Sequence, residues 1–436
     1  MVNYGGDEVS ALVLDIGSST TRAGYAGDDT PKAVIPTCFG LQKDTPKDVD
    51  VNMGGEENES KPSSSATSAR RMFVGNNGPT IWREGMEVAY PYSEGLITDF
   101  DAVTALASHA FRDIMRTDTS EHPILVTESA WNTAANRERM AEIMFEEFQV
   151  PAFYIANTGV LNAFAAGKGS ALVIDIGRDT ASVTPVVDGF VLRKGVAHSA
   201  LPKLVHAHAM HVLTNPTSHR PGIQLLPHQL IANKQPVDPG KPPRFTLRDD
   251  RVSGTTDSWR QWYEAREVDE WIQAVAGVLD QGWNEQAALA RGVRHYEFPT
   301  GYNFYFGAER FQVGEQWFTH SPQLIASNPN LPMSLPALIK TSLQQCDQDL
   351  RPVLMGNVVL TGGGSLFAGL SERLSAELTR NFAHAKIHSP GNPAERRYGG
   401  WLGGSILASL GNFHQLWISK EEWQEHGKKI VAQRCK

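Results

Sequence analysis

The sequence predicts an α/β protein with two related lobes, and three of its features lead to this prediction. The chain has 436 residues, more than one hydrophobic core usually holds, so at least two domains of ordinary size are expected. A ten-residue segment occurs twice, at 11–20 and at 171–180, with seven identical positions. Amphipathic helical segments alternate with short apolar strands, a pattern typical of layered α/β architectures. The duplication favours two lobes that face each other across a cleft.

The composition is that of a folded protein and argues against several function classes. Apolar residues make up 41% and charged residues 20% of the chain, close to the average of globular proteins. The formal net charge of −8 argues against a broad basic surface for nucleic acid. Three widely spaced cysteines predict neither a disulfide framework nor a zinc site. With no long apolar run and no basic-then-apolar start, we expect neither a membrane span nor secretion.

Each copy of the repeat is predicted to form a strand, a tight turn and a second strand. The first strand ends in Asp-x-Gly, and the second strand covers 23–26 in one copy and 182–187 in the other. A carboxylate such as Asp15 or Asp175 at this point can hold hydrated magnesium, while backbone N–H groups of the turn bind phosphate. Because Asp and Gly are also the commonest turn residues, a single copy would indicate only a turn. Two facing copies favour a site that clamps a triphosphate.

Two further segments fit the same architecture. Residues 132–148 carry apolar residues at helical spacing and end before Pro151, which predicts an amphipathic helix. Residues 358–365 run from an apolar strand into three glycines, and a helical pattern follows from Leu370. Glycines at such a point let the backbone approach a nucleotide closely. Alone this signal is weak, since glycine-rich strand ends are often only turns.

Two stretches break the α/β pattern. Residues 41–71 are rich in Ser, Asp, Glu, Lys and Gly and lack aromatic residues before Arg71, so we expect a disordered surface insertion. Residues 214–258 are dominated by Pro, Gly, His and Arg, and we expect them to be irregular.

Several of these motifs resemble the actin family. DIGSSTTRAG, DIGRDTASVTPVVDG and VVLTGGGS are similar to the phosphate and adenosine elements of the superfamily of actins, sugar kinases and heat-shock chaperones. EHPILVTESAWNTAANRERM, YEFPTGYNFYFGAERF and RRYGGWLGGSILASLGNFHQLW resemble actin segments in particular, in the same order, and the resemblance covers roughly two thirds of the chain. It implies an α/β, actin-like two-lobed ATPase fold of duplicated ribonuclease H-like domains with a central nucleotide cleft. The first lobe would comprise 1–165 completed by 399–436, and the second lobe 166–398.

The resemblance also implies a cofactor, ATP with magnesium or calcium. Asp15 and Asp175 match the two carboxylates that hold the cation through water. The other cofactor-binding residues that it implies are Gly17, Ser18, Ser19, Thr20 and Arg22 in the first hairpin, Gly177, Arg178, Asp179 and Thr180 in the second, and Gly362, Gly363, Gly364, Leu366, Phe367 and Arg397 near the adenosine. Arg397 stands where actin has lysine, and no residues match the family's lysine–glutamate pair beside adenine.

Three positions around the attacking water depart from the family pattern. Thr158 matches a glutamine that orients water, and Ser182 falls near the position of a histidine that helps arrange it. Arg178 replaces a small residue or a carboxylate. We therefore expect ATP binding with little or no hydrolysis. Arg178 also admits an arginine-finger interpretation, which we discount because no residue orients the water. The alternative function is an active actin-like ATPase with nucleotide-dependent assembly.

The opening YGGDEVSALVLDIGS and the segment WLGGSILASLGNFHQLW are most similar to nuclear members of the actin family that serve chromatin remodelling and histone acetyltransferase complexes. This implies residence in the nucleus and a structural and regulatory role. The partners implied are actin, a helicase/SANT-associated scaffold helix of a remodeller or acetyltransferase subunit, and nucleosomes or histones through the complex.

Surface features bear on these partners. The stripe Leu402, Ile406, Leu407 and Leu410 has helical spacing, for which core packing is the default explanation. In actin the matching helix, together with the residue matched by Phe164, lines an apolar groove that receives partner helices. In actin a loop with an apolar tip docks onto the next filament subunit, whereas residues 43–70 here are acidic, rich in serine and poor in apolar anchors, so no self-assembly into filaments is expected.

Overall fold

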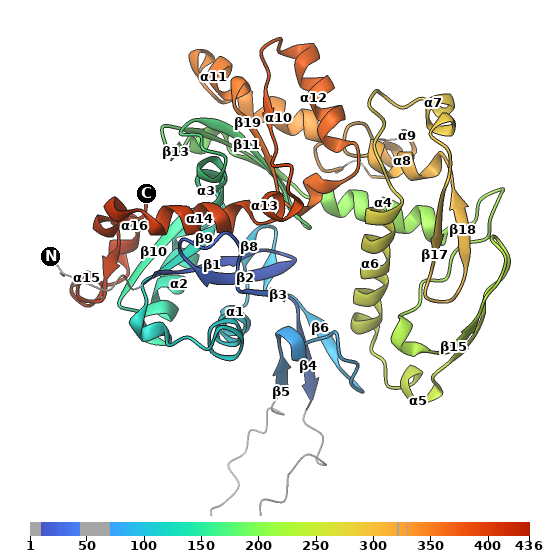
Figure 1. Cartoon of the computed structure of the whole chain (residues 1–436), viewed down its shortest axis with the longest axis horizontal. Helices are drawn as coiled ribbons and strands as arrows, with labels where there is room; N and C mark the ends of the chain where they lie inside the picture. Colours follow the sequence, from blue (N-terminus) through green and yellow to red (C-terminus); the bar gives the residue numbers. More distant parts are fainter. Residues whose placement is uncertain (1–9, 44–69, 321, 329) are drawn as a thin grey trace, which may run out of the picture.

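The computed structural model describes residues 10–43, 70–320, 322–328 and 330–436, and it has two lobes, each built on a sheet (Figure 1). The sheet of the first lobe has the order β21 (Ile418–Ser419), β10 (Ala152–Asn157), β9 (Ile124–Glu128), β1 (Leu12–Ile16), β2 (Thr20–Tyr25) and β3 (Ala33–Pro36). The sheet of the second lobe has the order β13 (Phe190–Val191), β12 (Ala181–Val187), β11 (Ala171–Ile176), β19 (Val358–Thr361) and β20 (Ile387–His388), and β14 (Ala197–Ser199) also pairs with β12.

The two sheets share one topology. In the first, β1 has an antiparallel partner, β2, on one side and a parallel partner, β9, on the other. In the second, β11 is likewise antiparallel to β12 and parallel to β19. The sequence repeat is therefore a structural repeat, and the two-lobed α/β architecture predicted from it is confirmed.

Helices flank these sheets and fill the second lobe. Their bounds are α1 Phe100–Ser108, α2 Ala134–Glu146, α3 Thr158–Ala165, α4 Leu201–Thr214, α5 Asp249–Val252, α6 Asp257–Ala274, α7 Glu285–Ala290, α8 Glu309–Glu315, α9 Pro322–Ser327, α10 Leu335–Gln344, α11 Arg351–Gly356, α12 Leu370–Asn381, α13 Pro393–Arg397, α14 Gly399–Ser409, α15 Lys420–His426 and α16 Lys429–Arg434. Among the described residues, none of these helices combines the length and apolarity needed to span a bilayer.

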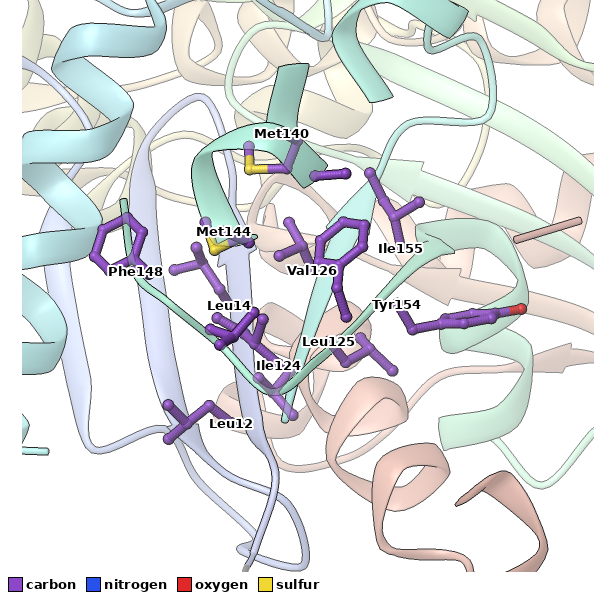
Figure 2. Close-up of a cluster of buried hydrophobic side chains, with 14 of the residues drawn as sticks. Leu12, Leu14, Ile124, Leu125, Val126, Met140, Met144, Phe148, Tyr154 and Ile155 are labelled. Carbon is purple, nitrogen blue, oxygen red and sulfur yellow. The ribbon is translucent and has the colours of Figure 1, made fainter. Parts of the chain in front are cut away.

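The core of the first lobe lies between its sheet and α2, as Figure 2 shows. Leu14 of β1 and Val126 of β9 are buried against Met140 and Met144, which recur on one face of α2. The Thr133 hydroxyl accepts the first free N–H of this helix, from Asn136, as a good N-cap does. The helix predicted over 132–148 is thus confirmed, because its apolar spacing matches the face that the sheet buries.

The chain crosses between the lobes at α3 and α14, which pack closely together (Figure 1). α3 connects β10 of the first sheet to β11 of the second, and α14 leads from the second lobe back to β21. A Cβ on Gly403 of α14 would stand only 1.9 Å from the carbonyl oxygen of Leu161, so glycine is required for this approach. The C-terminal segment continues on the first lobe, where β21 pairs with β10 and α16 packs on α2. The exact lobe limits, 1–165 with 399–436 and 166–398, stay a prediction.

The two segments that were expected to lack regular structure, 41–71 and 214–258, both contain strands. Of the insertion expected at 41–71, residues 44–69 lie outside the described residues, whereas its ends belong to paired strands, β4 (Phe39–Lys43) and β5 (Arg70–Phe73). The stretch 214–258 is not irregular throughout, because β15 (Ile231–Gln235) and β16 (Arg244–Leu247) form a hairpin. Its turn uses Gly240 at φ +79°, a conformation that glycine adopts without strain, so the Pro-Gly cluster marks a turn between strands.

The remaining strands are short and form small sheets. β4 also pairs with β6 (Glu87–Ala89), β7 (Tyr92–Ser93) pairs with β8 (Leu96–Ile97), and β17 (Arg294–Glu297) pairs with β18 (Asn303–Phe306).

Candidate functional site

The two repeated hairpins turn in the same way. In the first, the Gly17 N–H donates to the Thr20 carbonyl oxygen at 3.1 Å, and in the second the Gly177 N–H donates to that of Thr180 at 2.9 Å. A Cβ on either glycine would stand 3.2 Å from the same carbonyl oxygen, closer than most side chains tolerate. Ser18 and Ser19 lie within the first turn, and Arg178 and Asp179 within the second. Each turn thus joins two strands with backbone N–H groups available at its tip, as phosphate binding requires.

Asp15, the residue before the last of β1, has a partner on each carboxylate oxygen. It is 5% exposed, and its Oδ2 accepts from Nη1 of Arg22 at 2.5 Å. Its Oδ1 accepts from the Thr127 hydroxyl at 2.6 Å. Arg22 stands directly opposite Asp15 in the β1–β2 register. The first hairpin therefore supplies its own counter-charge.

Asp175, the matching residue of β11, has no such counter-charge on its partner strand. The residue opposite it in the β11–β12 register is Ser182, where the first hairpin has Arg22. Burial and the nearby negative charge of Asp15 together raise the pKa of Asp175 to about 6, and Arg22 acts in the opposite direction. The two carboxylates are thus close enough to interact, and one of them lacks a compensating cation.

The third motif packs directly on the second hairpin. Gly362, which follows β19, has φ +87°, and a Cβ there would stand 2.3 Å from Oδ1 of Asp175. A Cβ on Gly364 would stand 2.5 Å from Cγ2 of Ile176. A Cβ on Gly363 would be 3.9 Å from Cγ of Arg397, so α13 also reaches this loop. The glycine loop and the second hairpin, which lie far apart along the chain, are therefore in close contact, and only glycine fits at Gly362 and Gly364.

The other two residues predicted near the adenosine are half-buried. Phe367 packs edge-to-face on Trp317, with ring centroids 6.1 Å apart, and contacts the core of the second lobe. Leu366 ends the short 3-10 turn that begins at Gly363. Of the two, Phe367 thus has a packing role in addition to the binding role that the resemblance implies.

These residues fit a divalent cation and a triphosphate. The uncompensated Asp175 offers a site for a cation, which would lower the cost of holding two carboxylates together. Within the described part of the chain, Nε of Arg22 is buried without a hydrogen-bond partner, so the guanidinium retains a donor. Gly362 and Gly364 let the third motif lie directly against Asp175 and Ile176.

Thr158 and Ser182, two of the three residues expected at the water site, are fixed by backbone structure. Thr158 is the first residue of α3, whose N-cap Asn157 accepts from the Gly159 N–H. A Cβ on Gly400 would stand 3.7 Å from Cγ2 of Thr158, so the threonine methyl group faces α14. Ser182 is buried within β12. Both side chains are short, and neither has the reach of the glutamine or histidine that it replaces.

Arg178, the third such residue, lies between the two lobes. Its Nε is 3.9 Å from Oδ2 of Asp269 on α6, and its guanidinium carbon lies 5.7 Å from the centroid of the Tyr90 ring. His206 of α4 is 3.4 Å from the other oxygen of Asp269. Arg178 is thus engaged by protein groups, which disfavours the arginine-finger interpretation.

Sequence reasoning missed three residues here. Thr127 binds Asp15, and its signal was available, since it ends a buried strand parallel to β1. Asp269 pairs with Arg178, and nothing local in α6 indicates it. Tyr92 is half-buried and lies close enough to both carboxylates to interact with them, and desolvation raises its pKa to about 12.

The residues predicted to line the partner groove are partly half-buried and partly exposed. Ile406 and Leu410 are 36% and 38% exposed. Leu402 and Leu407 are half-buried against the core of the first lobe, and Phe164 is half-buried on α3. Core packing therefore explains only part of the stripe.

A shallow surface hollow lies elsewhere, lined by His228, Glu270, Tyr296 and neighbouring residues of β15 and β17. It shares no residue with the two hairpins or the glycine loop.

Comparison with known proteins gives a consistent result over the length of the chain. The family model described as Actin matches residues 6–436. The chain is 38% identical to actin-related protein 4 of Yarrowia lipolytica, with 99% of this chain and 97% of that protein covered. It is 36% identical to actin-related protein 4 of Mycosarcoma maydis, with 99% of each covered, and 35% identical to that of Arabidopsis thaliana, with 99% of this chain and all of that protein covered.

Replacing Asp175 with Asn should stabilise the nucleotide-free protein near neutral pH, by about 1–2 kcal/mol. The folded-state pKa of about 6 lies above the ordinary 3.8, so the wild type loses stability as the pH rises from the lower value to the higher. The gain from Asp175→Asn should be complete above about pH 6 and vanish toward pH 4. Urea unfolding of the variant and the wild type at several pH values measures this difference in the free energy of unfolding.

Asp15→Asn is the matched control. It leaves Arg22 without its carboxylate and should lower the free energy of unfolding, by about 1–3 kcal/mol. If Asp15→Asn and Asp175→Asn lowered the free energy of unfolding equally at neutral pH, that result would contradict the asymmetry between the hairpins.

Proposed function

This chain belongs to the actin family, and from that membership we propose that it binds ATP with magnesium or calcium between its lobes, hydrolyses it little or not at all, and serves as a structural and regulatory subunit of nuclear complexes. The observation that carries the binding proposal is the pair of matching hairpins with one uncompensated carboxylate.

The chain's own groups divide the binding work. The N–H groups of the two turns bind phosphate oxygens, and Arg22 offers its free donor while it neutralises Asp15. Asp175 would hold the cation through water, and a cation held there would supply positive charge beside the phosphates. The loop at 362–364 brings backbone close to the adenosine.

Weak hydrolysis follows from what surrounds the γ-phosphate in this proposal. An attacking water needs a polar side chain that holds it in line with the bond to be broken. Thr158 is too short for this, and its methyl group faces Gly400. Arg178 is engaged by Asp269 and Tyr90. ATP then acts as a bound ligand that stabilises the closed fold by mass action.

Thr158→Gln should increase the rate of phosphate release from bound ATP, on the order of tenfold or more, because it restores a side chain able to orient water. The measurement is single-turnover phosphate release from protein loaded with ATP, with Thr158→Ala as the control. Brisk turnover by the wild type would instead support the alternative, an active ATPase that assembles with its nucleotide cycle.

The subunit role rests on the exposed part of the groove. We infer that Ile406 and Leu410 contact partners when the chain pairs with actin on a helicase/SANT-associated scaffold helix, which links the protein to nucleosomes or histones through the complex. The nucleus is the compartment that this role requires. Filament assembly is not part of the proposal, and the loop that bears on it, at 44–69, lies outside the described residues.

Leu410→Asp should weaken assembly with actin and the scaffold helix about tenfold or more, because it places a charge in an apolar interface. Leu410 is 38% exposed, so the free energy of unfolding should change by less than about 1 kcal/mol. Val353→Asp on α11, 48% exposed in the free chain, is the matched control. Equal binding by both variants in a reconstituted complex would rule out the groove.

A further inference from the structure

The two lobes touch a second time, far from α3 and α14. Residues 73–90 of the first lobe and residues 229–263 of the second meet where β6 lies beside α6 (Figure 1). We call this set of contacts the clasp. Its buried members are Cys38, Met86, Leu230, Trp259, Trp262 and Tyr263, with Phe73, Trp82 and Val88 packed against them.

Two indole groups at the clasp, those of Trp82 and Trp259, have hydrogen-bond partners on the opposite side. Trp259, only 1% exposed, donates from its indole to the carbonyl oxygen of Pro79 at 2.9 Å. Trp82 donates from its indole to the Thr255 hydroxyl, also at 2.9 Å. Such partners are what buried indole groups need, and an interface assembled by chance rarely provides them.

Backbone groups also pair across the clasp. The Gly85 N–H donates to the Gly254 carbonyl oxygen at 2.8 Å, and the Val88 N–H donates to the Ser258 hydroxyl at 3.0 Å. Thr80 accepts through its carbonyl oxygen from the Tyr263 hydroxyl at 3.1 Å. The last two of these bonds join residues that are 170 and 183 positions apart in the chain.

Each half of the clasp is fixed to its own lobe. β6 pairs with β4, which continues from the first sheet through Cys38, while α6 extends from Trp259 into the core of the second lobe at Trp271. Tyr90, directly after β6, lies against Arg178 of the second hairpin turn. The clasp therefore adjoins the candidate nucleotide site, and the lobes cannot separate there unless it breaks.

We propose that the clasp holds the lobes closed with or without nucleotide, so that exchange of ATP waits for the clasp to break. This inference rests on the proposed binding of ATP between the lobes. A cleft closed only by its ligand would open when empty, whereas these contacts involve no ligand at all.

A reversible crosslink tests the proposal. A Cβ on Gly254 would stand 3.4 Å from Cβ of Glu84, close to the separation in a disulfide, so Glu84→Cys with Gly254→Cys should bridge the clasp. The full-length double variant should crosslink at the same rate with and without Mg-ATP. Oxidation should slow release of a fluorescent ATP analogue at least tenfold, and reductant should restore it. The single-cysteine variants are controls, and the three native cysteines are buried.

Weakening the clasp should have the opposite effect. Trp82→Ala should speed release of the analogue at least tenfold, whereas Trp283→Ala, which removes an indole elsewhere in the second lobe, should leave it unchanged. Crosslinking that requires ATP, or release unaffected by oxidation, would overturn the proposal. If the analogue does not bind, the proposed function fails, and crosslinking of the nucleotide-free chain still decides whether the clasp stays closed.

Discussion

Two carboxylates of like charge, Asp15 and Asp175, lie near the ends of the central strands of the two sheets, close enough to interact, and the rest of the site depends on how their charge is balanced. Arg22 and Thr127 balance Asp15 from within the first lobe. The second lobe has Ser182 where the first has Arg22, so its carboxylate is left for a cation. In the proposed function, this difference between the two hairpins leaves Asp175 available for the cation of a metal-bound triphosphate.

That site needs the two lobes to be held together, and the chain does so at two places. At one, Gly403 lets α14 approach the backbone of α3, so the crossing between the lobes is tight. At the other, Trp82 and Trp259 bond across the clasp. Proteins that work by repeated opening usually keep such contacts weak, since mobile elements come from the less stable parts of a fold. These two attachments between the lobes therefore agree with slow release of the nucleotide and with a structural role for the subunit.

The sequence predicted what local patterns and the repeat encode. The hairpins at Asp15 and Asp175 and the helix α2 follow from residue spacing, and the structure has them where the patterns lie. The hairpin β15–β16 was missed because its short, exposed strands bury no regular face, so only its turn residues leave a signal. The sequence could not predict the pairing of Arg178 with Asp269 or the contacts of the clasp. Both join residues that are far apart in the chain, and no sequence repeat relates those residues.

The central claim is that this chain keeps an intact nucleotide between its lobes, and the most direct test is to purify it without added nucleotide, denature it, and identify what is released. The account predicts a near-equimolar amount of ATP with little ADP, and loss of that ATP in Asp175→Asn. Release of mostly ADP would contradict weak hydrolysis, and release of no nucleotide from a protein that also fails to bind Mg-ATP would contradict the site itself.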